Sequence, residues 1–245
     1  MLGSDETLYF VTGRYPGTVH SVGVSNWDNA VCPYETGRDP GSPVPNGPAL
    51  GADGSIYVMC AAIEGGGLYK LDPASGTVLA FAIYSRGSTE PMLDPSGRIH
   101  AGYQAFGGAF FVGSYDTWDS ALNHLNGNFM DYTTGRASLF PDGSSTVRIG
   151  YSFTTDIRLE AEGAHFWEIF SDGQTIPNFT SVPSVDASST VFIGTTTGVQ
   201  ALRGKDGSVM WSFITNDHVT TQPVIPAPGV LLVGSDSGNV YSFKQ

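Results

Sequence analysis

The sequence has little positive charge. Its 245 residues include 11 Lys and Arg against 23 Asp and Glu, for a formal net charge of −12, and only Lys70, Lys205 and Lys244 are lysines. A nucleic-acid-binding protein needs a basic stripe to neutralise phosphates, and anionic membrane surfaces attract basic segments. Nucleic acid is therefore excluded as a partner. We also expect no membrane insertion, because no apolar run approaches the roughly 20 residues of a spanning helix.

Cysteine and histidine are scarce as well. The two cysteines, Cys32 and Cys60, permit at most one disulfide, no C-x-x-C pair is present, and the five histidines are scattered. We therefore expect no metal site. Residues 1–6 have neither a basic nor an apolar region of a signal peptide. The localisation stays open between a cytoplasmic protein, a processed secreted or periplasmic form, and an excised fragment.

Glycine and proline, in contrast, are abundant, with 32 Gly and 15 Pro. This density is incompatible with long helices and typical of many tight turns between short strands. Hydrophobic residues make up 40% of the chain and aromatic residues 12%, so a substantial core is available. The composition indicates an all-β protein.

One pattern recurs along the whole chain, with copies that begin at residues 48, 91, 137, 183 and 223. Pro48, Pro91, Pro183 and Pro223 open four of these copies, and Ala137 opens the other. In the four proline-led copies a turn residue follows six positions later: Gly54, Gly97, Ser189 and Gly229. Further signals predict a third strand in each copy, at residues 120–122 in the third copy and 166–169 in the fourth, and then a turn, at residues 123–127 in the third copy. A fourth short strand follows, which gives four short strands per repeat. This spacing is typical of propeller blades.

We therefore predict a β-propeller of about six four-stranded antiparallel blades, in a single domain over residues 1–245. The predicted repeats cover residues 1–47, 48–90, 91–136, 137–182, 183–222 and 223–245. Stacked blades bury apolar residues that one blade alone would expose. The first copy begins just before Met1, and the last stops at Gln245 without a fourth strand. An alternative in which the chain forms part of a larger ring stays open.

The segment 201–211 resembles the tryptophan-docking repeat of quinoprotein-type (PQQ-like) propellers. Ala201, Gly207 and Trp211 match that pattern, although Arg203 replaces its acidic residue. Two other copies match less fully. Asp72, Ser75 and Gly76 match with Ala80 in the tryptophan position, and Ala121, Asn123 and Gly127 match with Asp131 there.

This resemblance implies a propeller fold and leaves two branches of the family. The quinone-dependent dehydrogenases are longer and carry an adjacent cysteine pair, whereas Cys32 and Cys60 are separated here. We therefore carry over no cofactor. The chain is more similar to the non-catalytic branch, which includes the outer-membrane assembly lipoproteins.

Candidate binding residues gather on one predicted face. In a blade, the loop between strands two and three and the loop from strand four to the next blade lie on the same side, the mouth. We assign to it ten candidate partner- or ligand-binding residues: Arg14, Tyr15, Arg86, Glu90, Tyr115, Asp116, Trp118, Arg136, Asp156 and His218. Residues 154–163 are expected as an enlarged loop there. Guanidinium, carboxylate and aromatic groups suit a polar ligand or a peptide, although loops are generally polar.

Three hypotheses for function follow. The first is a non-catalytic binding or scaffold propeller that engages a protein or peptide at the mouth, with no catalytic residue assigned. The second is an enzyme, a divergent quinoprotein fragment or a glycan-acting hydrolase or lyase, with His218, Arg86 and Tyr115 converging on substrate. The third is a carbohydrate-binding propeller that stacks sugars on Trp118 and Tyr115. Convergence of Arg86, Tyr115, Asp116 and His218 on a common point would favour the enzyme.

Overall fold

A computed structural model describes residues 1–12, 18–23, 26–29, 47–60, 67–83, 90–107, 110–130, 138–142, 144–151, 154–161, 164–170 and 177–244. Every regular element in these ranges is a β-strand. Within them, no helix is long and apolar enough to cross a membrane. The chain divides into two compact units, Met1–Thr133 (unit 1) and Thr134–Gln245 (unit 2). Each unit contains three antiparallel sheets and is described by itself.

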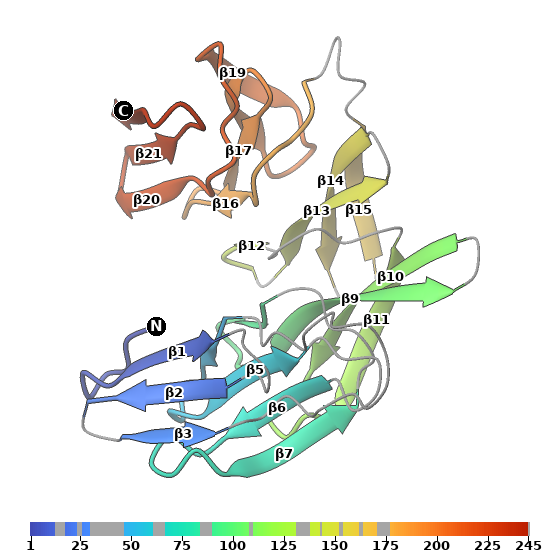
Figure 1. The fold of residues 1–245 in the computed structure, drawn as a ribbon. Coiled ribbons are helices and arrows are strands. Elements are labelled where there is room, and N and C mark those ends of the chain that lie inside the picture. Colours follow the sequence, from blue (N-terminus) through green and yellow to red (C-terminus); the bar gives the residue numbers. More distant parts are fainter. Residues whose placement is uncertain are drawn as a thin grey trace. The chain divides into compact units, whose positions relative to one another are not determined.

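Unit 1 contains one three-stranded and two four-stranded sheets (Figure 1). The first consists of β1 (Leu8–Thr12), β2 (Thr18–Val22) and β3 (Trp27–Asn29). The second consists of β4 (Ala49–Leu50), β5 (Ile56–Cys60), β6 (Gly67–Leu71) and β7 (Val78–Ile83). The third consists of β8 (Met92–Leu93), β9 (Ile99–Gly107), β10 (Phe110–Trp118) and β11 (His124–Met130).

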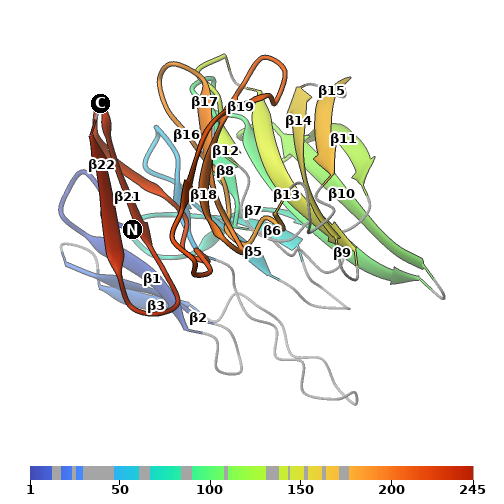
Figure 2. The ribbon, with the colours of Figure 1, turned by 90° about the horizontal axis from the view of Figure 1, so that it is seen from above.

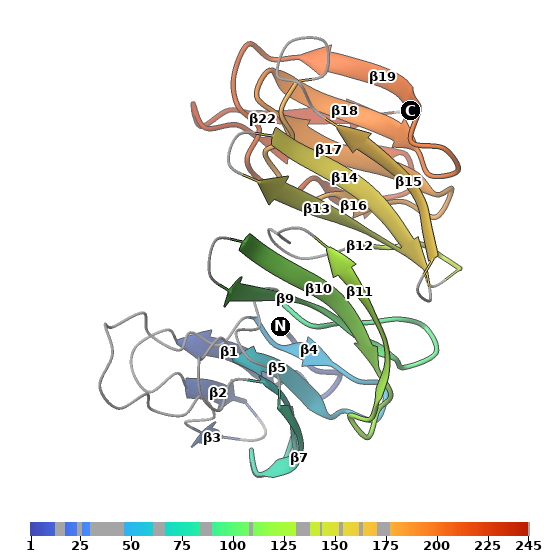
Figure 3. The ribbon, with the colours of Figure 1, turned by 90° about the vertical axis from the view of Figure 1, so that its right-hand side faces the viewer.

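Unit 2 contains two four-stranded sheets followed by a three-stranded one, side by side in Figures 2 and 3. The first consists of β12 (Ser138–Leu139), β13 (Ser145–Tyr151), β14 (Thr154–Ala161) and β15 (Ala164–Phe170). The second consists of β16 (Ser184–Val185), β17 (Thr190–Thr195), β18 (Gly198–Arg203) and β19 (Val209–Ile214). The third consists of β20 (Val224–Ala227), β21 (Val230–Gly234) and β22 (Val240–Lys244).

Each sheet lies within one predicted repeat, and consecutive strands pair with each other throughout. The turn after the first strand has the predicted chemistry. Gly54, Gly97, Ser189 and Gly229 all have positive φ, at 81°, 82°, 62° and 72°. Glycine favours this backbone region because it has no Cβ, and a serine there adopts it with more strain. The assignment of the whole chain to a single domain stays a prediction.

The first residues of the chain lie in the frame of the repeat. Leu2 forms an antiparallel bridge with Leu8, and the Met1 carbonyl accepts a hydrogen bond of 2.8 Å from the Tyr9 amide. Met1 and Leu2 thus occupy the place that Ala49 and Leu50 have in the next sheet. At the other end, β22 is an edge strand and the last sheet has three strands.

Two strand assignments from the sequence are wrong. In the third copy, the third strand is β10 rather than residues 120–122, and the turn that follows uses Leu122 at φ 66° in place of a glycine. Gly127, expected in that turn, lies in β11. In the fourth copy, the expected enlarged loop over 154–163 is strand β14, and residues 166–169 belong to the fourth strand, β15.

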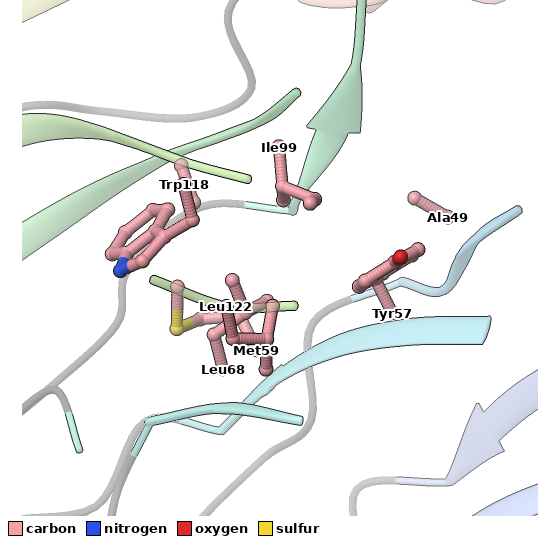
Figure 4. Packing of buried hydrophobic residues seen from close by; sticks show 8 residues of the cluster. Ala49, Tyr57, Met59, Leu68, Ile99, Trp118 and Leu122 are labelled. Carbon is pink, nitrogen blue, oxygen red and sulfur yellow. The ribbon is translucent and has the colours of Figure 1, made fainter. Parts of the chain in front are cut away.

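The hydrophobic core lies between neighbouring sheets. Val19, Ile56 and Leu71 pack between the first two sheets of unit 1. Met59, Leu68 and Trp118 pack between its second and third sheets, and Figure 4 shows their side chains gathered together. In unit 2, two equivalent clusters contain Phe140, Trp167, Val191 and Ile193, and Val199, Val219, Leu231 and Val233. Blades that bury apolar faces against their neighbours are what the repeat predicted.

Two tryptophans fasten a sheet to the next one. Trp27 Nε1 donates a hydrogen bond of 2.9 Å to the Pro73 carbonyl, and Trp167 Nε1 donates one of 2.8 Å to the Gly204 carbonyl. Each acceptor lies in the turn between the third and fourth strands of the following sheet. These are docked tryptophans of the kind that the family resemblance implied, although the sequence pattern had singled out Trp211.

Candidate functional site

The structure describes the side chains of only some candidate residues. Arg14, Tyr15, Arg86 and Arg136 lie outside the described residues. Tyr115 and Asp156 are described in main chain alone, in β10 and β14, so the prediction that they lie on mouth loops is wrong. Glu90 precedes β8 as predicted and is half-buried. A Cβ at Gly47 would lie 2.6 Å from Glu90 Oε1, so these two residues pack closely.

Asp116 and Trp118 are not mouth-loop residues either. Both lie at the end of β10, where Trp118 pairs with Ile99 and His124 next to the turn into β11. This end belongs to the opposite side, which we call the turn side, where strands one and two and strands three and four are joined. Trp118 is 2% exposed within the core (Figure 4). Its ring therefore does not offer a surface on which a sugar could stack.

Asp116, whose side chain is buried, pairs with an exposed histidine that sequence reasoning missed. Asp116 Oδ1 lies 2.8 Å from His124 Nε2, and the His124 side chain is 55% exposed. Burial raises the pKa of Asp116, and the hydrogen bond from His124 offsets part of that shift. A Cβ at Gly127 would lie 1.9 Å from Asp116 Oδ1, so the carboxyl group occupies space that only glycine leaves free. A carboxyl group and an imidazole at hydrogen-bond distance can exchange a proton.

A second buried carboxylate closes the hairpin between β8 and β9. Asp94 Oδ2 lies 2.6 Å from Arg98 Nε and 3.1 Å from His100 Nε2, and the Asp94 side chain is 1% exposed. Burial acts to raise the pKa of Asp94, but hydrogen bonds from Ser96, His100 and Arg98 together hold it well below its ordinary value. Burial lowers the pKa of His100, and Asp94 offsets only part of this effect. Because these groups are paired with one another within a tight turn, we infer that the network stabilises the hairpin.

In unit 2 the predicted sorting of loops into two sides is confirmed. The Val219 amide donates to the Thr195 carbonyl at 3.1 Å, and the Asp236 amide donates to the His218 carbonyl at 2.9 Å. Connections that leave a fourth strand therefore lie beside the hairpins between second and third strands. On the turn side, the Gly204 amide donates to the Ser189 carbonyl at 2.9 Å. His218 thus lies on the mouth side, as predicted.

The residues around His218 form a braced pair of loops. We define the mouth loops as the connection 215–223 and the hairpin 235–239. The Ser237 amide donates to Asp217 Oδ2 at 3.0 Å, and Thr220 Oγ1 donates to Asp236 Oδ1 at 2.5 Å. Hydrogen bonds from the hydroxyls of Ser237 and Ser235 lower the pKa of Asp217 to about 2, so its carboxylate is ionised at neutral pH. The loops are held by these bonds, while the His218, Thr220 and Asp236 side chains are exposed.

Of the four residues whose convergence would favour an enzyme, the structure describes the side chains of Asp116 and His218. Asp116 and Tyr115 belong to unit 1 and His218 to unit 2, and Arg86 lies outside the described residues. In the described ranges, no group of three or more His, Cys, Asp or Glu could hold a metal ion. Cys60 is disulfide-bonded, and the other cysteine of the sequence, Cys32, lies outside the described residues. The mouth loops are therefore the best-assembled exposed polar cluster in the described part of unit 2.

Comparison with known proteins identifies the fold. No family model matches the chain, and no curated protein matches it. BamB from Moraxella catarrhalis is similar, with 14% identity and a TM-score of 0.52 over 100% of this chain and 83% of that chain. A gluconolactonase from Xanthomonas campestris has 13% identity and a TM-score of 0.53 over 99% and 83% of the two chains.

A third similar structure is a quinohemoprotein alcohol dehydrogenase from Comamonas testosteroni. It has 14% identity and a TM-score of 0.61, and the match covers 80% of this chain and 40% of that chain. Likenesses at this level of identity show the fold alone. They confirm that the chain is a β-propeller, a fold that a gluconolactonase and an alcohol dehydrogenase also have.

Proposed function

We propose that this chain is a binding propeller whose mouth loops in unit 2 engage a protein or peptide partner. The observation that carries the proposal is the bracing of the mouth loops, which leaves His218, Thr220 and Asp236 exposed on a fixed backbone. Loops on a rigid scaffold are common binding elements, and a preorganised surface loses less conformational entropy when a partner binds.

The charge of the surface suggests the chemistry of the partner. Asp217 is ionised at neutral pH, Asp236 lies beside it in the mouth loops, and the chain has a formal net charge of −12. Such a surface attracts positively charged segments and speeds their association. We therefore propose a partner segment that contains lysine or arginine and contacts Asp236 and His218. The enzyme alternative stays a prediction, and a carbohydrate-binding role would have to use a surface other than the buried Trp118 ring.

Site-specific crosslinking tests this proposal. A photoreactive amino acid is placed at His218 and, as a matched control, at the exposed Ala187 in the turn on the opposite side. A partner that crosslinks from position 218 is identified, purified and titrated against the unmodified chain. We expect Asp236→Ala and His218→Ala each to weaken its binding by at least about fivefold, because truncation of a side chain that contributes to an interface costs about 1 kcal/mol or more. Equal crosslinking from both positions, or unchanged affinity of both variants, would refute the proposal.

A further inference from the structure

The pair of Asp116 and His124 departs from the repeat. The sheets that end in β7, β11 and β19 each have a register shift in their third strand, so the pairs that follow the shift occupy equivalent positions. In the sheet that ends in β11, this pair is Trp118 with His124. In the other two sheets the equivalent pairs are Leu71 with Val78 and Leu202 with Val209. A blade therefore folds with valine at this position and does not require an imidazole there.

A glycine makes room for the carboxyl group of this pair. Asp116 pairs across the strands with Gly127, where a Cβ would lie 1.9 Å from Asp116 Oδ1. The equivalent residues in the other two sheets are Phe81 and Ser212. The Asp116 side chain is 7% exposed, and a buried carboxyl group is costly unless it has a hydrogen-bond partner. His124 Nε2, at 2.8 Å, is such a partner.

The surroundings of the pair belong to unit 1. Trp118 packs with Met59 and Leu68 of the second sheet (Figure 4). Asp116 lies two residues earlier on the same strand, so it is on the same face of the third sheet. The His124 ring lies edge-on to the Trp118 ring, with 5.9 Å between the ring centroids and 69° between the planes. The ring contact and the carboxyl group thus orient the imidazole, while the His124 side chain is 55% exposed.

The second ring nitrogen distinguishes His124 from two other histidines of unit 1. In His20 and His100 both ring nitrogens are engaged, one with an aspartate and the other with a threonine. Among the residues that the structure describes, His124 Nδ1 has no such partner. An ionised carboxylate accepts a hydrogen bond from Nε2–H, so the lone pair of the neutral imidazole lies on Nδ1. A base oriented in this way by a carboxylate is the arrangement that activates a nucleophile.

We propose that His124 acts as a general base that activates water for the hydrolysis of a carboxylic ester, with Asp116 as its positioning residue. Nδ1 takes a proton from water while the water oxygen attacks the acyl carbon. The bond between that carbon and the alcohol oxygen then breaks, and the imidazolium returns the proton to the leaving oxygen, which yields an acid and an alcohol. This activity goes beyond the proposed binding function and uses unit 1, whereas the mouth loops belong to unit 2.

The charges around His124 define the class of ester. Asp116 is its partner, Asp119 lies in the turn that precedes it, and the chain has a formal net charge of −12. This surface repels anions, so the ester is neutral or positively charged. Leu125, the next residue along β11, is 53% exposed and offers an apolar contact for the acyl group.

Hydrolysis of 4-nitrophenyl acetate by the full chain tests the inference. We expect saturable hydrolysis at neutral pH above the rate in buffer, and no such increase for the anionic 4-nitrophenyl phosphate. His124→Ala should lower kcat/KM at least about tenfold, because a general base contributes about 10²–10⁴-fold. Asp116→Asn should lower kcat at least about tenfold with KM unchanged, since an amide group can donate to Nε2 and leave the proton on Nδ1. His20→Gln, the matched control, should keep the full rate.

Chemical modification keeps the test valid where a variant does not fold. Diethyl pyrocarbonate acylates imidazole lone pairs, and peptide mass spectrometry locates the modified histidine. In the wild type, hydrolysis should be lost in step with modification of His124, and hydroxylamine, which removes the added group, should restore it. Hydrolysis that persists after complete modification of His124, an unchanged rate in His124→Ala, or equal hydrolysis of the acetate and phosphate esters would each overturn the inference.

Discussion

The two units use the same residue types in opposite ways. Unit 1 buries Asp94, Asp116 and Trp118, and each of them contacts a partner within its own sheet or the next. Unit 2 keeps Asp236 and Phe213 exposed, on a loop and on an outer strand. This difference shows that residue type alone does not indicate whether a carboxylate or an aromatic ring in a repeat takes part in binding. Its place in the blade decides whether it serves the fold or a partner.

The largest expected effect separates the two aromatic environments. Trp118→Ala should lower the free energy of unfolding of unit 1 by about 3–5 kcal/mol, because a fully buried ring leaves a cavity in a packed core. Phe213→Ala should cost about 1 kcal/mol or less, since its ring is already partly in water. Urea unfolding followed by circular dichroism, with native-state hydrogen exchange of β10 and β18, gives both values. Equal losses for the two variants would remove the contrast between buried and exposed aromatic residues.

A second expected effect concerns pH and the two buried carboxylates of unit 1. The pKa of Asp94 is lowered in the folded state, so its contribution to stability is present above the pKa of an unfolded Asp, about 3.9, and is lost as pH falls. The pKa of Asp116 is raised, so the folded state holds a proton that the unfolded state releases. The free energy of unfolding therefore falls, through this group, as pH rises from about 4 through the folded pKa of Asp116.

Two substitutions distinguish the opposite effects of Asp94 and Asp116 on the pH dependence of stability. Asp116→Asn should remove the cost of an ionised buried carboxyl group, so its stability relative to the wild type should improve between pH 4 and pH 7. Asp94→Asn should be less stable than the wild type throughout this interval, by an amount on the order of 3 kcal/mol for a broken buried ion pair, and the difference should shrink as pH falls below about 4. Urea unfolding at about pH 3, pH 4 and pH 7 measures the differences. The same slope for the two variants would contradict the assigned directions.

The sequence predicted the fold well because turn chemistry is local. The turns at Gly54, Gly97 and Gly229 follow from residue type and spacing, and Ser189 adopts the same conformation at the equivalent position of its copy. The prediction for the third copy was wrong because Leu122 adopts the turn conformation that a glycine was expected to supply. The sequence pattern therefore placed the turn at Gly127, which lies in β11. The cross-strand pair of Asp116 and His124 depends on that register, so sequence spacing could not reveal it. The docking of Trp27 and Trp167 depends on contacts with a neighbouring sheet, so only the three-dimensional structure reveals it.

The smallest expected effect is on the stability of the mouth loops. An unchanged free energy of unfolding there would strengthen the contrast between the buried residues of unit 1 and the exposed residues of unit 2. His218→Ala should change the free energy of unfolding by less than about 0.5 kcal/mol, because its contacts are made by the main chain and its side chain is exposed. Asp217→Ala should destabilise the chain more than His218→Ala, since its carboxylate accepts hydrogen bonds from the amides of Ser237 and His218. Thermal unfolding of both variants orders these effects. If His218→Ala destabilised the chain as much as Asp217→Ala, the imidazole would stabilise the folded loops. Loss of partner binding in His218→Ala would then no longer indicate that His218 contacts the partner.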